Sequence, residues 1–503
     1  MVEIGGIRLD NEQEQIVYDE SDNLLVVAGA GSGKTLTILG KIKYLINEKN
    51  IKPEEIICIS FTNETANNLK NKLKNMDIDV KVYTFHRLGL YFLKNKYQIA
   101  DPLTLENVIN NFFKIDVLYN KKLLEIVLNY FGLKTKEEYL KLYRTSYEYV
   151  YELEKLINTF IKLFKCNDYK LEDFNKFLKK ARSIFNIKNY KTEKHLLILC
   201  LNIYIEYEDY LKKNNEIDFD DMLTRAKERV YDTKTKYIII DEYQDTSYVR
   251  FSLIKEIIDK TNAKLMVVGD DFQSIYRFTG CDLELFTNFH KYFRNTKIRY
   301  ISNTYRNSNE LIDVAGSFIM KNKEQIKKKL KSNIHINKPI VMVRYKMKND
   351  LKKLILNIYK KNKNILILGR NNNDINGYLD KDFIIKDNKI IYLKNRKIDI
   401  KYLTVHKAKG LEADNVIIIN LYNKTLGFPN KMNDDKLLRF VSKNKINYPY
   451  DEERRLFYVA LTRTKEKVYL YTPFNSSVFV NELIDDYRNK IDIINIKDFK
   501  ENV

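Results

Sequence analysis

The sequence predicts an α/β protein with two domains, each built on a parallel sheet, and an all-helical insertion in the first domain. Short apolar strands alternate with amphipathic helices near the N-terminus and again after about residue 303, which favours parallel sheets. From residue 98 to 215 the periodicity is helical, and no proline follows Pro102 until Pro339. A chain of 503 residues with 44% apolar content can bury cores of this size.

The same patterns predict the boundaries of these units. We expect a first sheet domain at residues 1–97 and 216–302, a helical insertion at 98–215, a second sheet domain at 303–490 and a polar tail at 491–503. Apolar runs predict strands in the first domain at 24–27, 56–61, 237–240 and 264–269, with a short strand ending at Thr84, and in the second at 339–344, 365–368, 402–405, 416–420 and 468–471. Helices are expected from Lys34, Glu64, Ser308 and Glu452. Within the insertion, a core stripe is predicted at Tyr149, Leu153, Leu156, Phe160 and Leu163.

A glycine-rich loop follows the first buried strand and leads directly into a helix. It reads Ala28-Gly29-Ala30-Gly31-Ser32-Gly33-Lys34-Thr35. Glycines let a tight turn aim its N–H groups inward, and a helix N-terminus adds positive potential. In such a loop the lysine reaches the outer phosphates and the threonine hydroxyl can ligate Mg²⁺. The loop therefore predicts a nucleotide site.

Acidic and cationic groups elsewhere in the chain favour hydrolysis of that nucleotide. The strand at 237–240 ends in Asp241, suited to hold Mg²⁺, and Glu242, suited to polarise a water molecule. Gln273 follows the next strand and can sense a terminal phosphate. Tyr305-Arg306 and the run from Arg454-Arg455 to Arg463 supply cations from the second domain. A site that two domains complete together converts nucleotide state into domain closure, as a motor requires.

The composition limits which kinds of partner and which cellular compartment fit this protein. The formal net charge of +21 and pI near 9.3 favour a polyanionic partner, although a lysine-rich proteome would give the same balance. The lysine runs 327–329 and 360–361 are expected to be solvated. Four dispersed cysteines exclude a zinc pair or a disulfide framework, which indicates a reducing compartment. No apolar run reaches membrane length, so we expect a cytoplasmic protein with no membrane partner.

The ordered set of motifs resembles superfamily 1 helicases of the UvrD/Rep type. The resemblance spans residues 9 to about 483 and covers nearly the whole chain. It rests on LDNEQEQIV, AGAGSGKT, SFTN, TFH, IDFDD, DEYQDT, GDDFQSIYRFTG, NTYRN, TVHKAKGLEAD and EERRLFYVALTRT. It implies two RecA-like domains of the P-loop NTPase class.

Within that family the second half is most similar to the helicase IV group. IYRFTG, ILILGRNN, KGLEADNVIII, Gly427-Phe428-Pro429 and EERRLFYVALTRT carry this similarity. Larger UvrD and Rep proteins hold a regulatory domain between the motifs of Arg306 and His406, where this chain has only about 100 residues. We therefore expect that domain, and the N-terminal extension of helicase IV, to be missing, which leaves a bare motor.

The resemblance implies roles for individual residues in binding ATP and Mg²⁺. Gln13 would recognise adenine, Tyr305 would stack on it and Glu412 would hold the ribose. The loop residues 28–35, including Lys34, would hold phosphates. Thr35 and Asp241 would hold Mg²⁺, Glu242 would be the general base, and Gln273, Arg306 and Arg463 would contact the γ-phosphate.

The resemblance also implies a surface for single-stranded DNA. The positions that would line the strand are Phe61, Asn63, Phe85, His86, Tyr276, Phe278, Thr404 and His406. Stacking of bases on aromatic rings tolerates any sequence. Phe278 stands where UvrD-like proteins usually carry tryptophan, and Thr279 where many carry arginine, so strand separation is expected to be weaker than in those relatives.

Together these inferences predict an ATP-dependent translocase and helicase on single-stranded and tailed duplex DNA, in repair, recombination or defence. Movement 3′ to 5′ is implied by the resemblance alone. One alternative is a translocase that displaces proteins but unwinds poorly. Another is a helicase-like factor acting on RNA polymerase. A separately encoded nuclease or repair protein is a possible partner.

Overall fold

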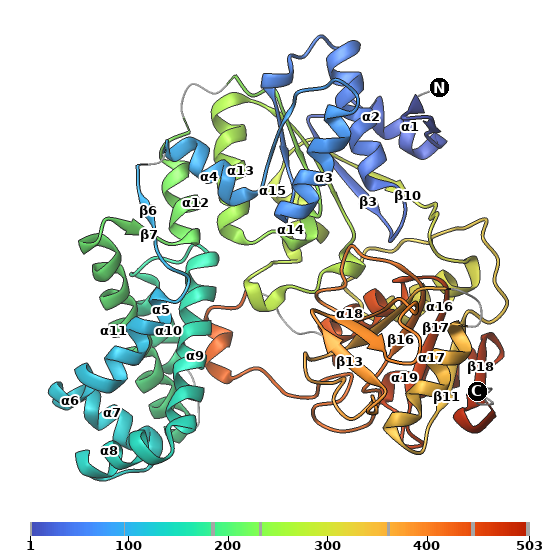
Figure 1. The fold of residues 1–503 in the computed structure, drawn as a ribbon. Coiled ribbons are helices and arrows are strands. Elements are labelled where there is room, and N and C mark those ends of the chain that lie inside the picture. The colour runs from blue at the N-terminus through green and yellow to red at the C-terminus, as the bar shows by residue number, and fades with distance from the viewer. Residues whose placement is uncertain are drawn as a thin grey trace.

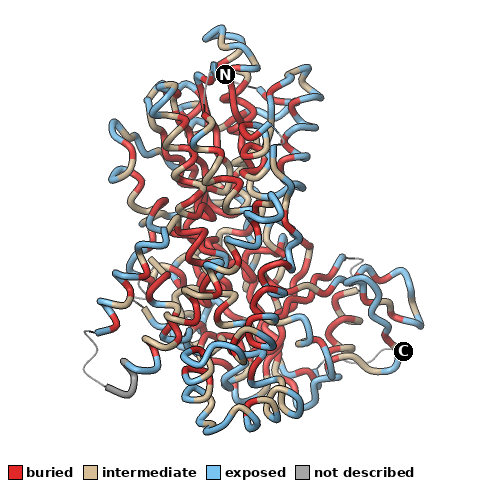
Figure 2. The backbone as a smooth tube through the Cα atoms, turned by 90° about the vertical axis from the view of Figure 1, so that its left-hand side faces the viewer, coloured by how far each residue is buried: buried red, intermediate tan, exposed pale blue. Residues whose placement is uncertain are grey.

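Three bodies make up the computed structural model, which describes residues 3–94, 96–182, 187–230, 234–359, 363–443 and 448–498. A first α/β lobe lies at the top of Figure 1, a helical body at the lower left and a second α/β lobe at the lower right. In Figure 2 the buried backbone runs through the interior of the molecule, while exposed segments lie mainly at the periphery. Both predicted sheets and the predicted insertion are present.

The first lobe is built on a six-stranded parallel sheet with strand order β10-β3-β9-β8-β4-β5. Its strands are β3 (Asn23–Ala28), β4 (Ile56–Ile59), β5 (Lys81–Tyr83), β8 (Tyr237–Ile240), β9 (Lys264–Gly269) and β10 (Thr296–Ile301). Side chains alternate along β3, so Leu24 and Val26 pack into one core and Leu25 and Val27 into another. β10 was not predicted from the sequence, because the residues of this edge strand are mostly exposed or half-buried and carry a weak apolar pattern.

Helices cover both faces of this sheet. They are α1 (Asn11–Val17), α2 (Lys34–Asn47), α3 (Asn63–Lys74), α4 (Phe85–Leu93), α12 (Phe219–Lys227), α13 (Tyr248–Thr261), α14 (Glu284–Thr287) and α15 (Phe289–Tyr292). A small hairpin of β1 (Glu3–Ile4) and β2 (Ile7–Arg8) precedes them.

The helical insertion leaves and re-enters the first lobe through a two-stranded parallel pair, β6 (Gln98–Ile99) and β7 (Glu216–Ile217). Its helices are α5 (Thr104–Asn111), α6 (Val117–Tyr119), α7 (Lys121–Phe131), α8 (Lys136–Thr145), α9 (Tyr147–Cys166), α10 (Asp173–Arg182) and α11 (Ile187–Lys213). The predicted stripe on α9 is wrong at its first position, because Tyr149 is 62% exposed and Val150 is buried instead. Phe160 and Leu153 lie in the core as predicted.

The second lobe is built on an eight-stranded sheet of order β13-β14-β15-β12-β16-β17-β11-β18, parallel except at β13 and β14. Its strands are β11 (Ile340–Arg344), β12 (Ile365–Gly369), β13 (Phe383–Lys386), β14 (Lys389–Tyr392), β15 (Ile400–Thr404), β16 (Ala413–Ile418), β17 (Thr464–Thr472) and β18 (Ile491–Asn495). Its helices are α16 (Asn309–Ile319), α17 (Leu351–Tyr359), α18 (Asp451–Leu461) and α19 (Val478–Tyr487).

The expected tail at 491–503 begins instead with a strand of this sheet. β18 pairs in parallel with β11 from Ile340↔Ile491 to Arg344↔Asn495. Only Ile491 of β18 is fully buried, so its apolar signal in the sequence is weak.

A strap from the second lobe, residues 431–443, crosses to the helical insertion (Figure 1). It carries the 3₁₀ helix η7 (Lys436–Phe440), and Leu437, Phe440 and Val441 lie in the core of the insertion. The Asn167 side-chain amide donates to the Val441 carbonyl at 3.0 Å. This contact, which was not predicted from the sequence, ties the second lobe to the insertion.

Several predictions from composition can also be compared with the structure. Lys328 is buried rather than solvated, while Lys327 and Lys329 are exposed. Lys360 and Lys361 lie outside the described residues. All four cysteines are buried and none forms a disulfide. Within the described ranges, no helix has both the length and the apolar character needed to cross a membrane.

Candidate nucleotide and nucleic-acid site

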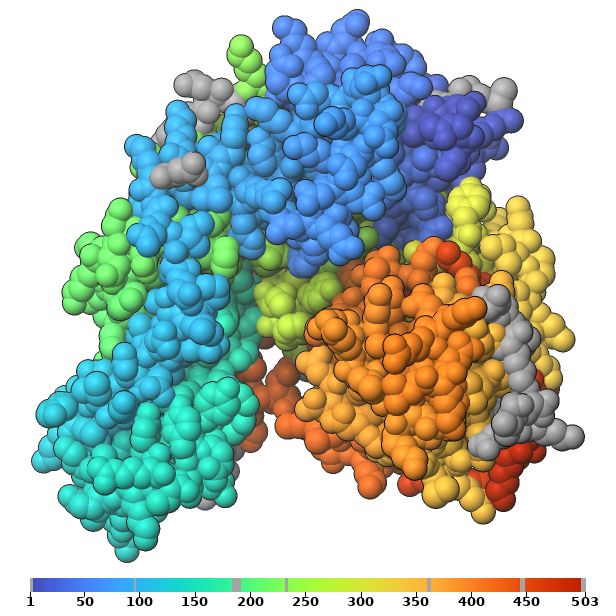
Figure 3. All heavy atoms as spheres, viewed as in Figure 1, coloured from blue at the N-terminus to red at the C-terminus, as the bar shows by residue number. Residues whose placement is uncertain are grey.

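A cavity of about 1200 Å³ lies where the two lobes meet. The first lobe lines it with the glycine-rich loop, the ends of β4 and β8 and the turn after β9, and the second lobe with the residues around Tyr305, His406 and Arg463. In Figure 3 the first lobe lies directly above the second lobe, and their surfaces touch. Residues that are far apart in the chain therefore share one cavity.

The glycine-rich loop connects β3 to α2 and forms one wall of this cavity. Gly31 has a φ of +69°, and a Cβ there would lie 2.5 Å from the Arg306 Cβ, so only glycine fits this close approach of the lobes. The Ser32 hydroxyl is buried and has no hydrogen-bond partner. A cradle that lacks side-chain bulk and retains an unpaired polar atom fits a phosphate group.

Lys34 and the acidic end of β8 face each other across the cavity. The Lys34 Nζ lies 2.6 Å from Glu242 Oε1, and Asp241 Oδ1 accepts from the Glu242 N–H at 2.9 Å. Burial and the Glu242 charge raise the pKa of Asp241, whereas Lys34 and Lys409 outweigh burial and lower the pKa of Glu242. The more acidic Glu242 therefore carries the negative charge that Lys34 neutralises.

The oxygen ligands available in the cavity fit a magnesium ion that is held partly by the protein and partly by the phosphates of a nucleotide. Thr35 and Asp241 line the same cavity. Among the described residues no group of three or more His, Cys, Asp or Glu side chains could hold a metal ion by itself. Mg²⁺ usually takes one or two protein ligands and completes its shell with phosphates and water.

Tyr305, assigned to the base, lines the cavity together with Gln13. Tyr305 is 58% exposed, its hydroxyl donates to Asp10 Oδ2 at 2.8 Å, and its N–H donates to the Gly31 carbonyl at 3.0 Å. Gln13 lies against the loop, where its Nε2 donates to the Ser32 carbonyl at 3.2 Å. Its Oε1 accepts from the Asp10 N–H at 3.0 Å, so both ends of the amide already have protein partners. In this arrangement Gln13 supports the loop.

Two arginines of the second lobe point into the cavity. Arg306 Nε donates to Glu412 Oε2 at 2.7 Å. Arg463 is 1% exposed and its Nη2 donates to Gln273 Oε1 at 3.0 Å, a direct hydrogen bond between the lobes. Burial, with the nearby Arg306 charge, lowers the pKa of Arg463 to about 9. Arg454 lies apart from this group and pairs with Glu482 at 2.6 Å.

Lys409 is a cation of the site that the sequence analysis did not single out. Its Nζ donates to the Gln273 carbonyl at 2.8 Å, pairs with Asp245 and lies 3.9 Å from Glu242 Oε2. The signal was present, because Lys409 stands in the motif between His406 and Glu412. Arg455 makes a second link, donating from Nε to the Ser274 carbonyl at 2.7 Å.

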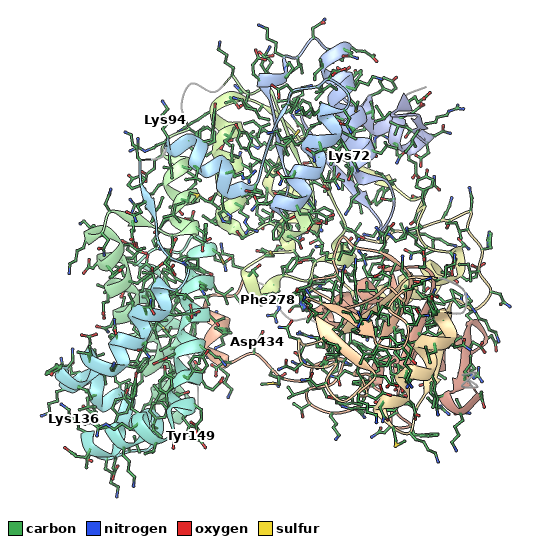
Figure 4. All side chains as sticks on the ribbon, in the orientation of Figure 1. Lys72, Lys94, Lys136, Tyr149, Phe278 and Asp434 are labelled. Atoms are coloured by element: carbon green, nitrogen blue, oxygen red, sulfur yellow. The ribbon has the colours of Figure 1, made fainter. Side chains whose placement is uncertain are left out.

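Four of the residues assigned to DNA form an aromatic cluster at the same lobe junction. Phe61 and Tyr276 are stacked, with centroids 5.5 Å apart and planes at 14°. The Tyr276 hydroxyl donates to the His406 carbonyl at 3.1 Å, and the Phe278 and His406 rings are 5.5 Å apart. Phe278 is 58% exposed, and Figure 4 shows it at the opening between the insertion and the second lobe.

The remaining assigned residues occupy different environments. Phe85 is only 4% exposed and packs in the core of the first lobe, so its ring has no face for a base in this arrangement. Asn63 is exposed at the start of α3, and Thr404 is 8% exposed. His86 packs against Phe219, with centroids 5.0 Å apart.

The two histidines of this surface are uncharged near neutral pH. Burial lowers the pKa of His86 and of His406 to about 4. The rings therefore offer apolar faces rather than cations.

Comparison with known proteins points to one family. Residues 9–294 match the family described as the UvrD/REP helicase N-terminal domain, and residues 381–473 match the UvrD-like helicase C-terminal domain. The chain is 28% identical to DNA helicase IV of Escherichia coli (strain K12) over 94% of its own length and 70% of that protein. It is 27% identical to a probable DNA helicase of Mycoplasma pneumoniae over 92% of its own length and 83% of that protein. It is 31% identical to the ATP-dependent DNA helicase Rep of Buchnera aphidicola subsp. Acyrthosiphon pisum over 70% of its own length and 51% of that protein.

Proposed function

Because this chain belongs to the UvrD/Rep helicase family, we propose that it is an ATP-driven motor that moves along single-stranded DNA and separates duplexes. The observation that carries the proposal is the Gln273–Arg463 hydrogen bond inside a cavity that also holds Lys34. A phosphate bound at the loop would lie beside groups from both lobes. Gain and loss of that phosphate would therefore change how the lobes meet.

We assign the hydrolytic roles on this basis. Lys34 would leave Glu242 and bind the β- and γ-phosphates, which frees Glu242 to accept a proton from the attacking water. Arg306 and Arg463 would stabilise the charge that develops on the phosphoryl oxygens. Thr35 and Asp241 would hold Mg²⁺, which neutralises phosphate charge when bound. Tyr305 offers an exposed ring for the adenine, and Glu412 would contact the ribose.

The DNA path is proposed to cross the aromatic cluster of Phe61, Tyr276, Phe278 and His406. Phe61, Tyr276 and His406 line the nucleotide cavity, and the Tyr276–His406 hydrogen bond joins the two lobes. Lobe closure would therefore move the members of the cluster relative to one another. Asn63, His86 and Thr404 would flank the strand. Movement 3′ to 5′, a cytoplasmic location and a role in repair, recombination or defence are proposed by analogy with the family.

A second candidate is a translocase that displaces bound proteins but unwinds poorly. The observation that favours it is the fold of the chain between Arg306 and His406, where the described elements α16, β11, α17 and β12 to β15 belong to the second lobe and form no additional domain. A tailed duplex and a streptavidin-blocked single strand, assayed side by side, distinguish the two activities. A nuclease or repair protein as partner, and binding to RNA polymerase, are further outcomes that a pull-down would test.

The first experiment is ATP hydrolysis with and without single-stranded DNA. We expect strong stimulation in the wild type and a loss of at least 100-fold in Lys34→Ala, because no other side chain of the loop carries a positive charge. Lys70→Ala, an exposed lysine on α3, is the control and should keep the wild-type rate. Substantial hydrolysis by folded Lys34→Ala would refute the site assignment.

A further inference from the structure

Lys328 is a buried cation in the segment that joins α16 to β11. Its side chain is 4% exposed, and its Nζ lies 2.5 Å from Asp270 Oδ1 and 2.5 Å from Asp271 Oδ1. It also lies 3.9 Å from the centre of the Phe272 ring. Both aspartate side chains are fully buried. One lysine thus pairs with two carboxylates in the turn after β9, and without it their burial would be more costly.

The segment around Lys328 is held in place on both sides. The Ile326 N–H donates to Asp271 Oδ2 at 2.8 Å, and the Lys331 N–H donates to the Ser302 carbonyl at 2.8 Å. Leu330 covers the phosphate loop so closely that a Cβ on Gly29 would lie 2.5 Å from Leu330 Cδ2. The ammonium group is therefore fixed relative to both the loop and the turn.

The other oxygen of Asp270 determines the orientation of Gln273. Asp270 Oδ2 accepts from Gln273 Nε2 at 2.5 Å, and Gln273 Oε1 accepts from Arg463 Nη2 at 3.0 Å. A side-chain amide donates only through nitrogen and accepts only through oxygen. The carboxylate, together with the guanidinium that can only donate, therefore fixes the amide with its oxygen toward the arginine of the other lobe.

Loss of Lys328 would disturb this orientation. Two carboxylates that both approach one nitrogen would repel each other without the cation, so one of them must take a proton or turn away. A protonated or displaced Asp270 no longer accepts from Gln273. A rotated amide would then present its NH₂ group to Arg463, and two donors facing each other do not bond.

We propose that Lys328 is a positioning residue for nucleotide hydrolysis: through Asp270 it holds the Gln273 amide with its oxygen toward Arg463, where the two lobes meet beside the phosphate loop. This inference rests on the proposed function, because it deepens the role of that site. Lys328 itself contacts no reacting atom.

The kinetic test compares Lys328→Met with Lys327→Met and Lys329→Met, which alter exposed neighbours in the same run. We expect kcat for DNA-stimulated ATP hydrolysis to fall about 10- to 100-fold in Lys328→Met, with KM for ATP within about 3-fold, because the lost contacts act on the transition state. Both controls should match the wild type. Lys328→Arg, which keeps the charge, should recover most of the rate. A folded Lys328→Met with kcat within 2-fold of the wild type would overturn the proposal.

A crystal structure of Lys328→Met without nucleotide gives a readout that does not depend on activity. We expect the Gln273–Arg463 contact to be lost, and an unchanged contact would overturn the proposal. If this variant does not fold, Lys328→Gln keeps a hydrogen-bond donor without the charge and is expected to show the same losses. A wild type without DNA-stimulated hydrolysis would instead refute the proposed function, while the crystal structure still decides the role of Lys328.

Discussion

Tyr276 gives the sharpest test of the proposed DNA surface. Its ring stacks on Phe61, its hydroxyl donates to the His406 carbonyl, and the Lys409 Nζ lies 5.0 Å from its centroid. Tyr276→Leu removes the aromatic face and keeps apolar bulk. Tyr276→Phe keeps the face and removes only the hydroxyl.

The expected magnitude follows from these contacts. A base stacked on an aromatic side chain is worth about 1 to 3 kcal/mol. Separating Phe61 from Tyr276 to admit the base costs about 0.5 to 1.5 kcal/mol of ring pairing. The net loss in Tyr276→Leu is therefore about 0.5 to 1.5 kcal/mol, which corresponds to a Kd for single-stranded DNA about 2- to 13-fold weaker. Tyr276→Phe should change Kd by less than about 3-fold, because stacking is preserved.

The assay is fluorescence anisotropy of a labelled oligothymidine, without nucleotide, over a series of salt concentrations. Tyr276 is uncharged, so the plots of log K against log salt for wild type and Tyr276→Leu should be parallel. Tyr119→Leu, which alters a tyrosine 85% exposed at the end of α6, is the control. Wild-type affinity in folded Tyr276→Leu would refute the stacking role, and a changed salt slope would show that the substitution disturbed phosphate contacts instead.

Three further predictions concern stability and chemistry. Gly280→Ala should lower the free energy of unfolding by about 2 to 5 kcal/mol, because φ is +83° and the new Cβ would lie 1.9 Å from Cys166 Sγ. The control Gly132→Ala, with φ of +69° and open space around it, should lower the free energy of unfolding by only about 1 to 2 kcal/mol. Both values are measured by denaturant unfolding, and equal losses would contradict the packing argument. Burial lowers the pKa of His406 in the folded protein to about 4, whereas in the unfolded protein it is about 6.5. Between these pH values the unfolded protein binds the proton and the folded protein does not, so the free energy of unfolding should fall as the pH drops from about 6.5 to 4. Denaturant titrations of His406→Gln should show a shallower fall than those of the exposed control His290→Gln, and identical curves would contradict the assigned burial. Arg463→Lys should reduce kcat for ATP hydrolysis by about 100-fold or more with little change in KM, because lysine cannot reproduce the planar, multidentate contacts of a guanidinium; steady-state kinetics that show an unchanged kcat would exclude a transition-state role.

Much of the candidate site was predictable from the sequence because its parts are local. The phosphate loop is contiguous, and the strand before Asp241 and Glu242 is recognisable from four apolar residues in a row. Both sheets follow from the alternation of strand and helix. Elements with weak local signals were missed, such as the edge strands β10 and β18, whose side chains are mostly not buried.

Local pattern could not show which side chains meet across the lobes. Three consecutive lysines look alike in sequence, yet only Lys328 is enclosed, because the turn after β9 places two carboxylates around it. The same holds for the strap residue Phe440, which packs into the helical insertion far from its own sheet.

The sequence alone therefore determined the fold class and the order of the elements and predicted a nucleotide site, since a phosphate loop, buried strands and amphipathic helices each occupy a short stretch of residues. The tertiary structure decided which groups form hydrogen bonds and which rings stack, such as Arg463 with Gln273 and Tyr276 with Phe61. Burial and pairing depend on groups that lie hundreds of residues apart, and only the packed lobes bring them within hydrogen-bonding or stacking distance.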